Sequence, residues 1–238
     1  MAKRVPREME FCVVSAGGVA TTRLISHFAG RRCVNSLCDE DSLKHLPVPP
    51  VSFNPRFRYI YLFGDPVPAI ISLFRRGYQT PQARKLQRGC RGPRPGPEMT
   101  IEDYARGGRD LFGFERHFDN YFERHLIHPT LFVRYEALWE NLDAIRDFLG
   151  FDAEEFRDFA PRCRRQSEDR PLCPVAFGQL RAIYRPFIDR LEAMPDAFVR
   201  GEHLAGHRGH LFFSANLRLA AVNALKDRLR SAHRLYGE

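Results

Sequence analysis

Two glycines and two threonines near the start of the chain have the types and the spacing of an anion-binding turn. Gly17 and Gly18 follow the apolar run Phe11–Val14, which has the composition of a buried strand, and Thr21 and Thr22 open a helical pattern. Glycine allows positive φ and a close approach of the backbone. Unpaired N–H groups and the positive end of the helix dipole then converge on one spot, to which the threonine hydroxyls add donors. The stretch therefore predicts a site for a phosphate-like group.

The same stretch also fits a turn between a strand and a helix that binds no ligand. The residue directly before Thr21 is Ala20 and not lysine, so the turn is not a Walker A motif, which has Gly-Lys-Ser/Thr at the start of its helix. Both interpretations stay open at this point.

A second candidate is the basic segment 75–94, which carries seven Lys or Arg residues and no Asp or Glu. Gly89, Gly92, Pro93 and Pro95 near its end favour a loop. We expect a mobile, solvated loop, which is either a charged surface or a lid over an anionic substrate.

Composition limits the classes of protein. The chain has 238 residues, a formal charge of +8 and 44% hydrophobic residues, which suits a globular protein whose partners are acidic. Its start is charged and its apolar runs fall short of the roughly 20 residues that span a membrane, so we expect a cytoplasmic protein. The six cysteines form no CxxC pair and are expected as reduced thiols. No nucleic-acid recognition motif accompanies the charge, so nucleic acid is not an expected partner.

Strand and helix patterns alternate along the chain. Strands are predicted at 11–14, 59–63 and 130–134, with short strand character at 33–34. Helices are predicted after 21, from Asp65-Pro66 to Gly77, over 111–126, from 138 to Gly150, over 153–159, over 175–194 with a kink or break at Pro186, and over 214–236. This order predicts a three-layer α/β/α fold with a parallel sheet of four or five strands. We expect a single domain over 1–238, with its core at about 11–151 and a helical part at 152–238.

Three segments, taken together and in order, resemble the sulfotransferase family, whose members transfer a sulfuryl group from 3′-phosphoadenosine 5′-phosphosulfate (PAPS) on a P-loop-like fold. GGVATTRL (17–24) is similar to the family's phosphosulfate loop Pro-Lys-Ser-Gly-Thr-Thr-Trp-Leu. YIYLFGDPVPAIISLFRR (59–76) is similar to its strand, Arg-Asp-Pro and helix segment. LFVRYEALWENLDAIRDFLGF (131–151) is similar to its Val-Arg-Tyr-Glu-Asp-Leu stretch. The resemblance covers about 11–151.

The resemblance implies a donor site on residues 17–23 and a serine for the 3′-phosphate. The residues that it assigns to donor binding are Gly17, Gly18, Val19, Ala20, Thr21, Thr22, Arg23, Ser72 and, by a fainter likeness of 198–216 to a C-terminal family segment, Arg200. Two basic residues of the family are missing, because its loop lysine falls on Gly18 and its 3′-phosphate arginine on Gly64. Arg23, Arg75 or Arg76 are candidates to replace the lysine.

The resemblance also implies a general base. Leu43-Lys44-His45-Leu46-Pro47 is similar to Lys-Thr-His-Leu-Pro of the family's cytosolic branch, whose histidine takes the proton of the acceptor. His45, beside Lys44, is therefore the expected base, and imidazole suits that task because its pKa lies near working pH.

The sequence is therefore interpreted as a PAPS-dependent sulfotransferase that acts on a hydroxyl or amine of a small molecule or glycan, without a metal and without a membrane partner. A non-catalytic relative that binds a nucleotide or a partner is one alternative, and an ATP- or GTP-dependent phosphoryl-transfer enzyme is another. His203, His207 and His210 resemble a metal cluster, but no cysteine or carboxylate completes a recognisable spacing.

Overall fold

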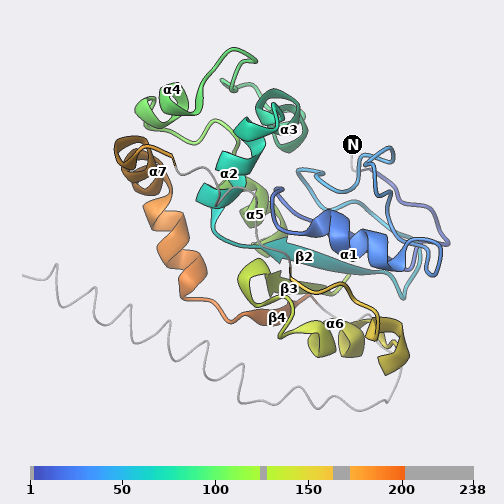
Figure 1. Ribbon diagram of the computed structural model, residues 1–238. Coiled ribbons are helices and arrows are strands. Elements are labelled where there is room, and N and C mark those ends of the chain that lie inside the picture. Colours follow the sequence, from blue (N-terminus) through green and yellow to red (C-terminus); the bar gives the residue numbers. More distant parts are fainter. Residues whose placement is uncertain (1–2, 124–127, 163–171, 202–238) are drawn as a thin grey trace, which may run out of the picture. The chain divides into compact units, whose positions relative to one another are not determined.

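The computed structural model describes residues 3–123, 128–162 and 172–201, all of which fall within one unit of the chain, residues 1–204. They form an α/β fold with a four-stranded, mostly parallel sheet at its centre (Figure 1). The predicted helix 214–236, the histidines 203, 207 and 210, and part of the predicted C-terminal helical region lie outside the described residues.

The sheet has the order β1-β2-β3-β4. Strands β1 (Phe11–Val14), β2 (Arg58–Phe63) and β3 (Thr130–Arg134) are parallel, as the sequence predicts. Strand β4 (Ala197–Arg200) is antiparallel to β3, so the prediction of an all-parallel sheet is wrong at this edge. The pattern did not reveal β4 because an edge strand that is half exposed or exposed lacks the apolar run of a buried strand.

The outer edge of β1 is lined by residues 33–35, where short strand character was predicted. Phe11 and Val34 form an isolated parallel bridge, and the side-chain amide of Asn35 both donates to the Val13 carbonyl (3.1 Å) and accepts from its N–H (2.8 Å). The chain thus passes to one side of β1 and returns on its other side as β2. In open α/β sheets such a reversal opens a crevice at the carboxyl ends of the strands, where ligands bind.

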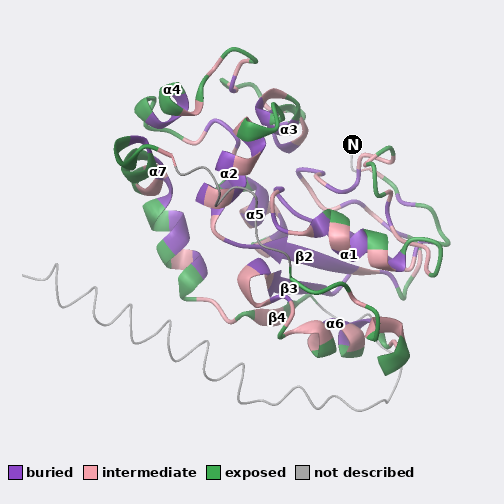
Figure 2. Ribbon diagram, in the orientation of Figure 1, coloured by how far each residue is buried: buried purple, intermediate pink, exposed green. Residues whose placement is uncertain are grey.

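The two faces of the sheet differ in composition. One face presents aromatic side chains such as Tyr61 and Phe132 to α2 (Pro66–Arg75), α5 (Phe114–Phe122) and α7 (Pro174–Glu192). The other presents mainly aliphatic side chains such as Ile60 and Val133 to α1 (Thr21–Phe28) and α6 (Leu142–Leu149). Strands β1, β2 and β3 are almost entirely buried (Figure 2), and helices pack on both faces.

Local sequence signals set most helix ends. The Asp65 carboxylate caps α2 by accepting from the Val67 N–H at 2.8 Å, and Gly150 ends α6 at a φ of 73°, as predicted. Helix α5 begins only at Phe114, because the Asp110 carboxylate accepts three successive N–H groups, those of residues 112, 113 and 114, and holds the chain out of the helix.

Three predictions about helices need correction. The basic segment 75–94 is not a plain loop, because it contains α3 (Gln79–Leu86). Pro186 does not split α7, which runs through it as one helix. The predicted helix 153–159 is a short 3₁₀ turn, η2 (Ala153–Phe156).

Two further short elements were not predicted. Helix α4 (Ile101–Arg106) has a capping box between Thr100 and Asp103, a signal that the sequence contained. A second 3₁₀ turn, η1 (Tyr135–Ala137), follows β3. No helix within the described residues is both long and apolar enough to cross a membrane.

Candidate functional site

The predicted anion-binding turn connects β1 to α1 through three residues in the left-handed region. Gly17 has a φ of 114°, Gly18 of 74° and Ala20 of 57°. Inside the turn, the Ser15 hydroxyl lies 2.6 Å from the Thr21 hydroxyl and accepts the Gly17 N–H at 3.1 Å. The glycines therefore permit the backbone conformation of the turn, and the Ser15 and Thr21 hydroxyls hold it.

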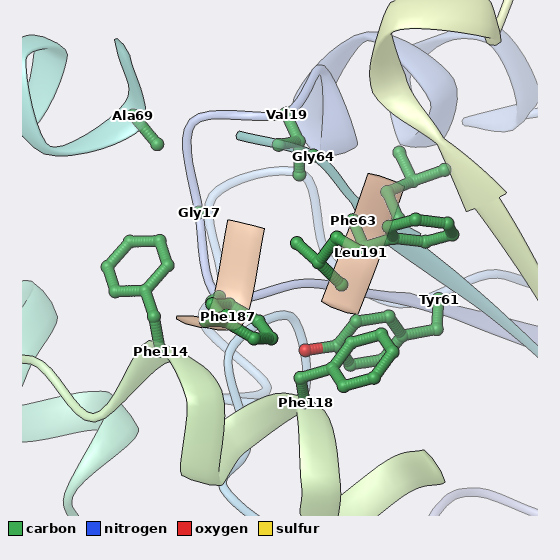
Figure 3. A pocket seen from close by; sticks show the side chains of 12 residues that line it. Gly17, Val19, Tyr61, Phe63, Gly64, Ala69, Phe114, Phe118, Phe187 and Leu191 are labelled. Carbon is green, nitrogen blue, oxygen red and sulfur yellow. The ribbon is translucent and has the colours of Figure 1, made fainter. Parts of the chain in front are cut away.

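Close packing explains why the turn needs glycine and has no room for the family's lysine. A Cβ on Gly17 would lie 2.8 Å from the side-chain nitrogen of Gln82, and a Cβ on Gly18 would lie 2.6 Å from the Cβ of Ala69. Real Cβ atoms do not approach so closely. Helix α2 thus occupies the space into which a side chain at position 18 would extend, and Figure 3 shows Ala69 directed from α2 toward the turn.

Helix α1 starts without a side-chain cap. Its N-cap residue is Ala20, which makes no side-chain capping hydrogen bond, whereas Asp65 caps α2. The first bond of the α1 ladder runs from the Leu24 N–H to the Ala20 carbonyl. The N–H groups of Thr21 and Thr22 precede this first bond, and the first turn of a helix is the arrangement that favours an anion.

Lys44 brings a positive charge to this helix start. Its Nζ donates to the Thr22 hydroxyl at 2.5 Å and to the Leu37 carbonyl at 3.1 Å, and the residue is only 7% exposed. Burial lowers the pKa of Lys44 from its ordinary value, and the carboxylate of Asp39 opposes that shift. The sequence suggested Arg23, Arg75 or Arg76 as the replacement for the missing lysine, but it is Lys44 whose ammonium group touches a threonine of the turn.

The expected base, His45, lies against the same turn. Its Nδ1 is 2.8 Å from the Ser15 carbonyl. Because a carbonyl only accepts, Nδ1 carries the proton and Nε2 presents its lone pair. Burial lowers the pKa of His45 to about 4, against a smaller opposing effect of the Ser15 carbonyl. The imidazole is therefore neutral near pH 7, as a general base must be.

A second histidine, which sequence analysis did not single out, lies near His45. His117 is buried on α5, and its Nδ1 is 2.8 Å from the Tyr61 hydroxyl. Burial lowers the pKa of His117 to about 3, and the neighbouring His45 adds to that effect. The sequence carries no signal for His117, because it lies at helical spacing from core aromatic residues of α5. A histidine in such a position cannot be told from an ordinary core residue by pattern alone.

A narrow cavity borders the turn on the aromatic face of the sheet (Figure 3). Its volume is about 20 Å³, room for about one water molecule. The rings of Tyr61, Phe114, Phe118 and Phe187 line it together with Gly17. A nucleotide is far larger than this cavity, whereas Thr22, on the turn's side of α1, is exposed.

The remaining predicted donor residues separate into two groups. Ser72 lies on α2, one turn after Ala69, on the face that packs against Gly18. Arg200 is paired with Thr130 at the start of β3, whereas the turn follows the ends of the parallel strands. The structure therefore places Arg200 at the opposite end of the sheet, with its guanidinium 4.2 Å from the centre of the Phe122 ring.

Gly64, where the family has an arginine, is also closely packed. A Cβ there would lie 2.8 Å from a carboxylate oxygen of Glu136, so a side chain at position 64 requires the Glu136 carboxylate to move. Among the described residues, no cluster of three or more His, Cys, Asp or Glu side chains is placed to hold a metal ion.

Comparison with models of known protein families gives no match for this chain, and comparison with curated protein sequences gives none either.

Proposed function

We propose that this chain is a PAPS-dependent sulfotransferase with a P-loop-like, sulfotransferase-like fold. One observation carries the proposal: consecutive residues on one loop place an ammonium group on Thr22 at the start of α1 (Lys44 Nζ, 2.5 Å) and an imidazole on the other end of the same turn (His45 Nδ1 to the Ser15 carbonyl, 2.8 Å). Sulfuryl transfer needs these two groups together, a cation at the leaving oxygen and a base at the acceptor.

The donor's 5′-phosphosulfate would lie against the N–H groups that open α1, with the Thr21 and Thr22 hydroxyls as further donors. Ser72 would face the 3′-phosphate from α2. Lys44 would neutralise the bridging oxygen on which charge develops as the bond to sulfur breaks. An anion in this position would also favour the charged form of Lys44, against the desolvation that lowers its pKa.

The transfer itself would use Nε2 of His45. As the acceptor oxygen or nitrogen attacks sulfur, its proton passes to Nε2, a new bond to sulfur forms, and the bond between sulfur and the bridging phosphate oxygen breaks. The products are the sulfated acceptor and adenosine 3′,5′-bisphosphate. The acceptor class is a hydroxyl or amine of a small molecule or glycan, and no metal takes part.

The experiment that tests the donor assignment is calorimetric titration of the protein with adenosine 3′,5′-bisphosphate, ADP and ATP, the last two with and without Mg²⁺. We expect the bisphosphate to bind at least about tenfold more tightly than ADP, because its 3′-phosphate, which ADP lacks, adds charge-assisted hydrogen bonds. Tighter binding of Mg-ATP would instead support a phosphoryl-transfer enzyme.

A second candidate is a non-catalytic protein that binds the same nucleotide. It is favoured by the absence of both basic side chains of the family at Gly18 and Gly64 and by the close packing of Gly18 against Ala69, which leaves no room for a lysine. Binding of the bisphosphate without transfer to any of a panel of phenols, amines and sugars would select this candidate.

A further inference from the structure

Helix α3 touches both halves of the candidate site. Gln82 on this helix donates from Nε2 to the Ala16 carbonyl in the anion-binding turn at 2.7 Å. Lys85, three residues on, donates from Nζ to Asp39 Oδ2 at 2.6 Å. Asp39 lies in the loop that carries Lys44 and His45, which we call the base loop (residues 36–46). One short helix therefore bonds both the anion-binding turn and the base loop.

The bond from Gln82 fixes a particular peptide group. It holds the Ala16 carbonyl, while the N–H of the same peptide, on Gly17, donates to the Ser15 hydroxyl at 3.1 Å. Both ends of this peptide are therefore bonded, which sets the direction in which the following N–H groups point. Gln82 is buried at 7% exposure, so no water competes freely for its amide.

The bond from Lys85 reaches a carboxylate that organises the base loop. The Asp39 side chain is 5% exposed, and its second oxygen accepts the Lys44 N–H at 3.0 Å. Asp39 also adopts a positive φ of 61°, a conformation that costs a non-glycine residue free energy and persists where its surroundings hold it. The Lys85–Asp39 pair thus acts on the backbone immediately before His45.

We propose that Gln82 and Lys85 are positioning residues. Through them, α3 holds the anion-binding turn and the base loop in fixed positions relative to each other. This inference rests on the proposed function for its catalytic consequence. Gln82 orients the anion-binding N–H groups, so its loss should weaken donor binding. Lys85 orients Lys44 and His45 through Asp39, so its loss should slow transfer from a bound donor.

Two pairs of matched variants test this in the full-length protein. Gln82→Glu keeps the shape of the side chain but replaces the amide donor by a carboxylate. Its control is Gln79→Glu, the same change at another buried glutamine of α3. Gln79 bonds the Pro97 carbonyl at 3.0 Å, away from the turn. Lys85→Met removes the ion pair, and Arg84→Met removes the neighbouring exposed charge. Lys85→Arg restores the cation.

We expect Gln82→Glu to weaken binding of adenosine 3′,5′-bisphosphate about tenfold, as loss of one buried hydrogen bond does. We expect Lys85→Met to lower kcat about tenfold with an unchanged Kd for the bisphosphate, and Lys85→Arg to regain most of it. Gln79→Glu and Arg84→Met should behave like the parent. If Gln82→Glu and Lys85→Met each match their control in both the Kd for the bisphosphate and kcat, the positioning role is refuted while the proposed function stands.

Hydrogen exchange separates failure of the inference from failure of the proposed function, because it needs no ligand. Gln82→Glu should speed amide exchange in residues 15–22 and Lys85→Met in residues 36–46, each more than its control. If the parent neither binds the bisphosphate nor transfers sulfate, the proposed function fails, and faster exchange would still support α3 as the support of both loops. Exchange equal to that of the controls would overturn the inference in either case.

Discussion

At the scale of residues, the charge and the base of the proposed site come from adjacent positions on one loop. Lys44 is buried and His45 half-buried, and burial lowers the pKa of each. A buried cation and a half-buried neutral imidazole at one turn are an arrangement typical of functional sites. It also makes the site sensitive to single substitutions.

Replacing Lys44 by methionine should lower turnover about 10²–10³-fold, because it removes the cation at the oxygen where charge develops. Methionine fills much of the same buried space, so the melting temperature should change little. Turnover with PAPS at saturation measures the effect, and Arg88→Met, at an exposed cation, is the control. Turnover in Lys44→Met equal to that of the control would contradict the role of Lys44.

The rate of transfer should depend on pH through His45. A base acts in its neutral form, and the pKa of His45 is lowered to about 4. The rate should therefore stay level from pH 8 down to about 5 and fall as the pH drops through about 4, well below the ordinary histidine value of about 6.5. A pH profile of kcat in the stable range measures this, and a midpoint near 6.5 would show that His45 is well hydrated or is not the base.

The buried His117 should make the fold less stable in acid. Its pKa is about 3 in the folded protein and about 6.5 when unfolded, so between these values the unfolded chain binds a proton that the folded chain does not. Stability is therefore complete above about pH 6.5 and decreases as the pH falls below it. Urea unfolding at pH 7 and pH 5 should show a smaller decrease in His117→Gln than in the parent. Equal decreases would mean that His117 does not titrate in this way.

At the scale of elements, the contact between the turn and α2 decides what position 18 can hold. Gly18 and Gly30 both have a positive φ, 74° and 80°, but a Cβ on Gly30 would meet nothing within 4 Å, whereas one on Gly18 would meet Ala69. Replacing Gly30 by alanine therefore costs only the free energy of the backbone conformation, whereas the same change at Gly18 adds the cost of close packing.

Gly30→Ala should destabilise the fold by about 1 kcal/mol through its backbone conformation alone. Gly18→Ala should cost a further 1–3 kcal/mol, roughly the cost of overpacking. Chemical denaturation measures both, and Ala69→Gly added to Gly18→Ala should recover part of the extra loss. Equal destabilisation by the two single substitutions would show that α2 yields easily and that a lysine would fit at position 18.

At the scale of the whole molecule, the sequence predicted the elements with strong local signals and missed those set by tertiary contacts. The strands Phe11–Val14 and Thr130–Arg134 have the predicted bounds, because continuous apolar runs with β-branched and aromatic residues indicate buried strands. Strand β4 was missed because it is a half-exposed or exposed edge. Helix α3 was missed because it is polar, contains a proline and lies within a basic segment that is typical of a loop.

The candidate site was predictable only in part for the same reason. The glycines and threonines of the turn are contiguous, and their spacing alone indicates the geometry that the structure has. The contacts of Lys44 with Thr22 and of Gln82 with Ala16 join residues 22 and 66 positions apart, and no local pattern encodes them. Arg200 illustrates the reverse case, where a faint sequence likeness assigned a residue that β4 places at the other end of the sheet.

The measurement that tests the account most directly is transfer of labelled sulfate from PAPS to a panel of phenols, amines and sugars, with the parent, Lys44→Met and His45→Ala side by side. We predict transfer by the parent to at least one acceptor, and a loss of about 10²–10⁴-fold in His45→Ala with little change in donor affinity. Absence of transfer by a parent that binds adenosine 3′,5′-bisphosphate, or transfer that survives both substitutions, would contradict the account.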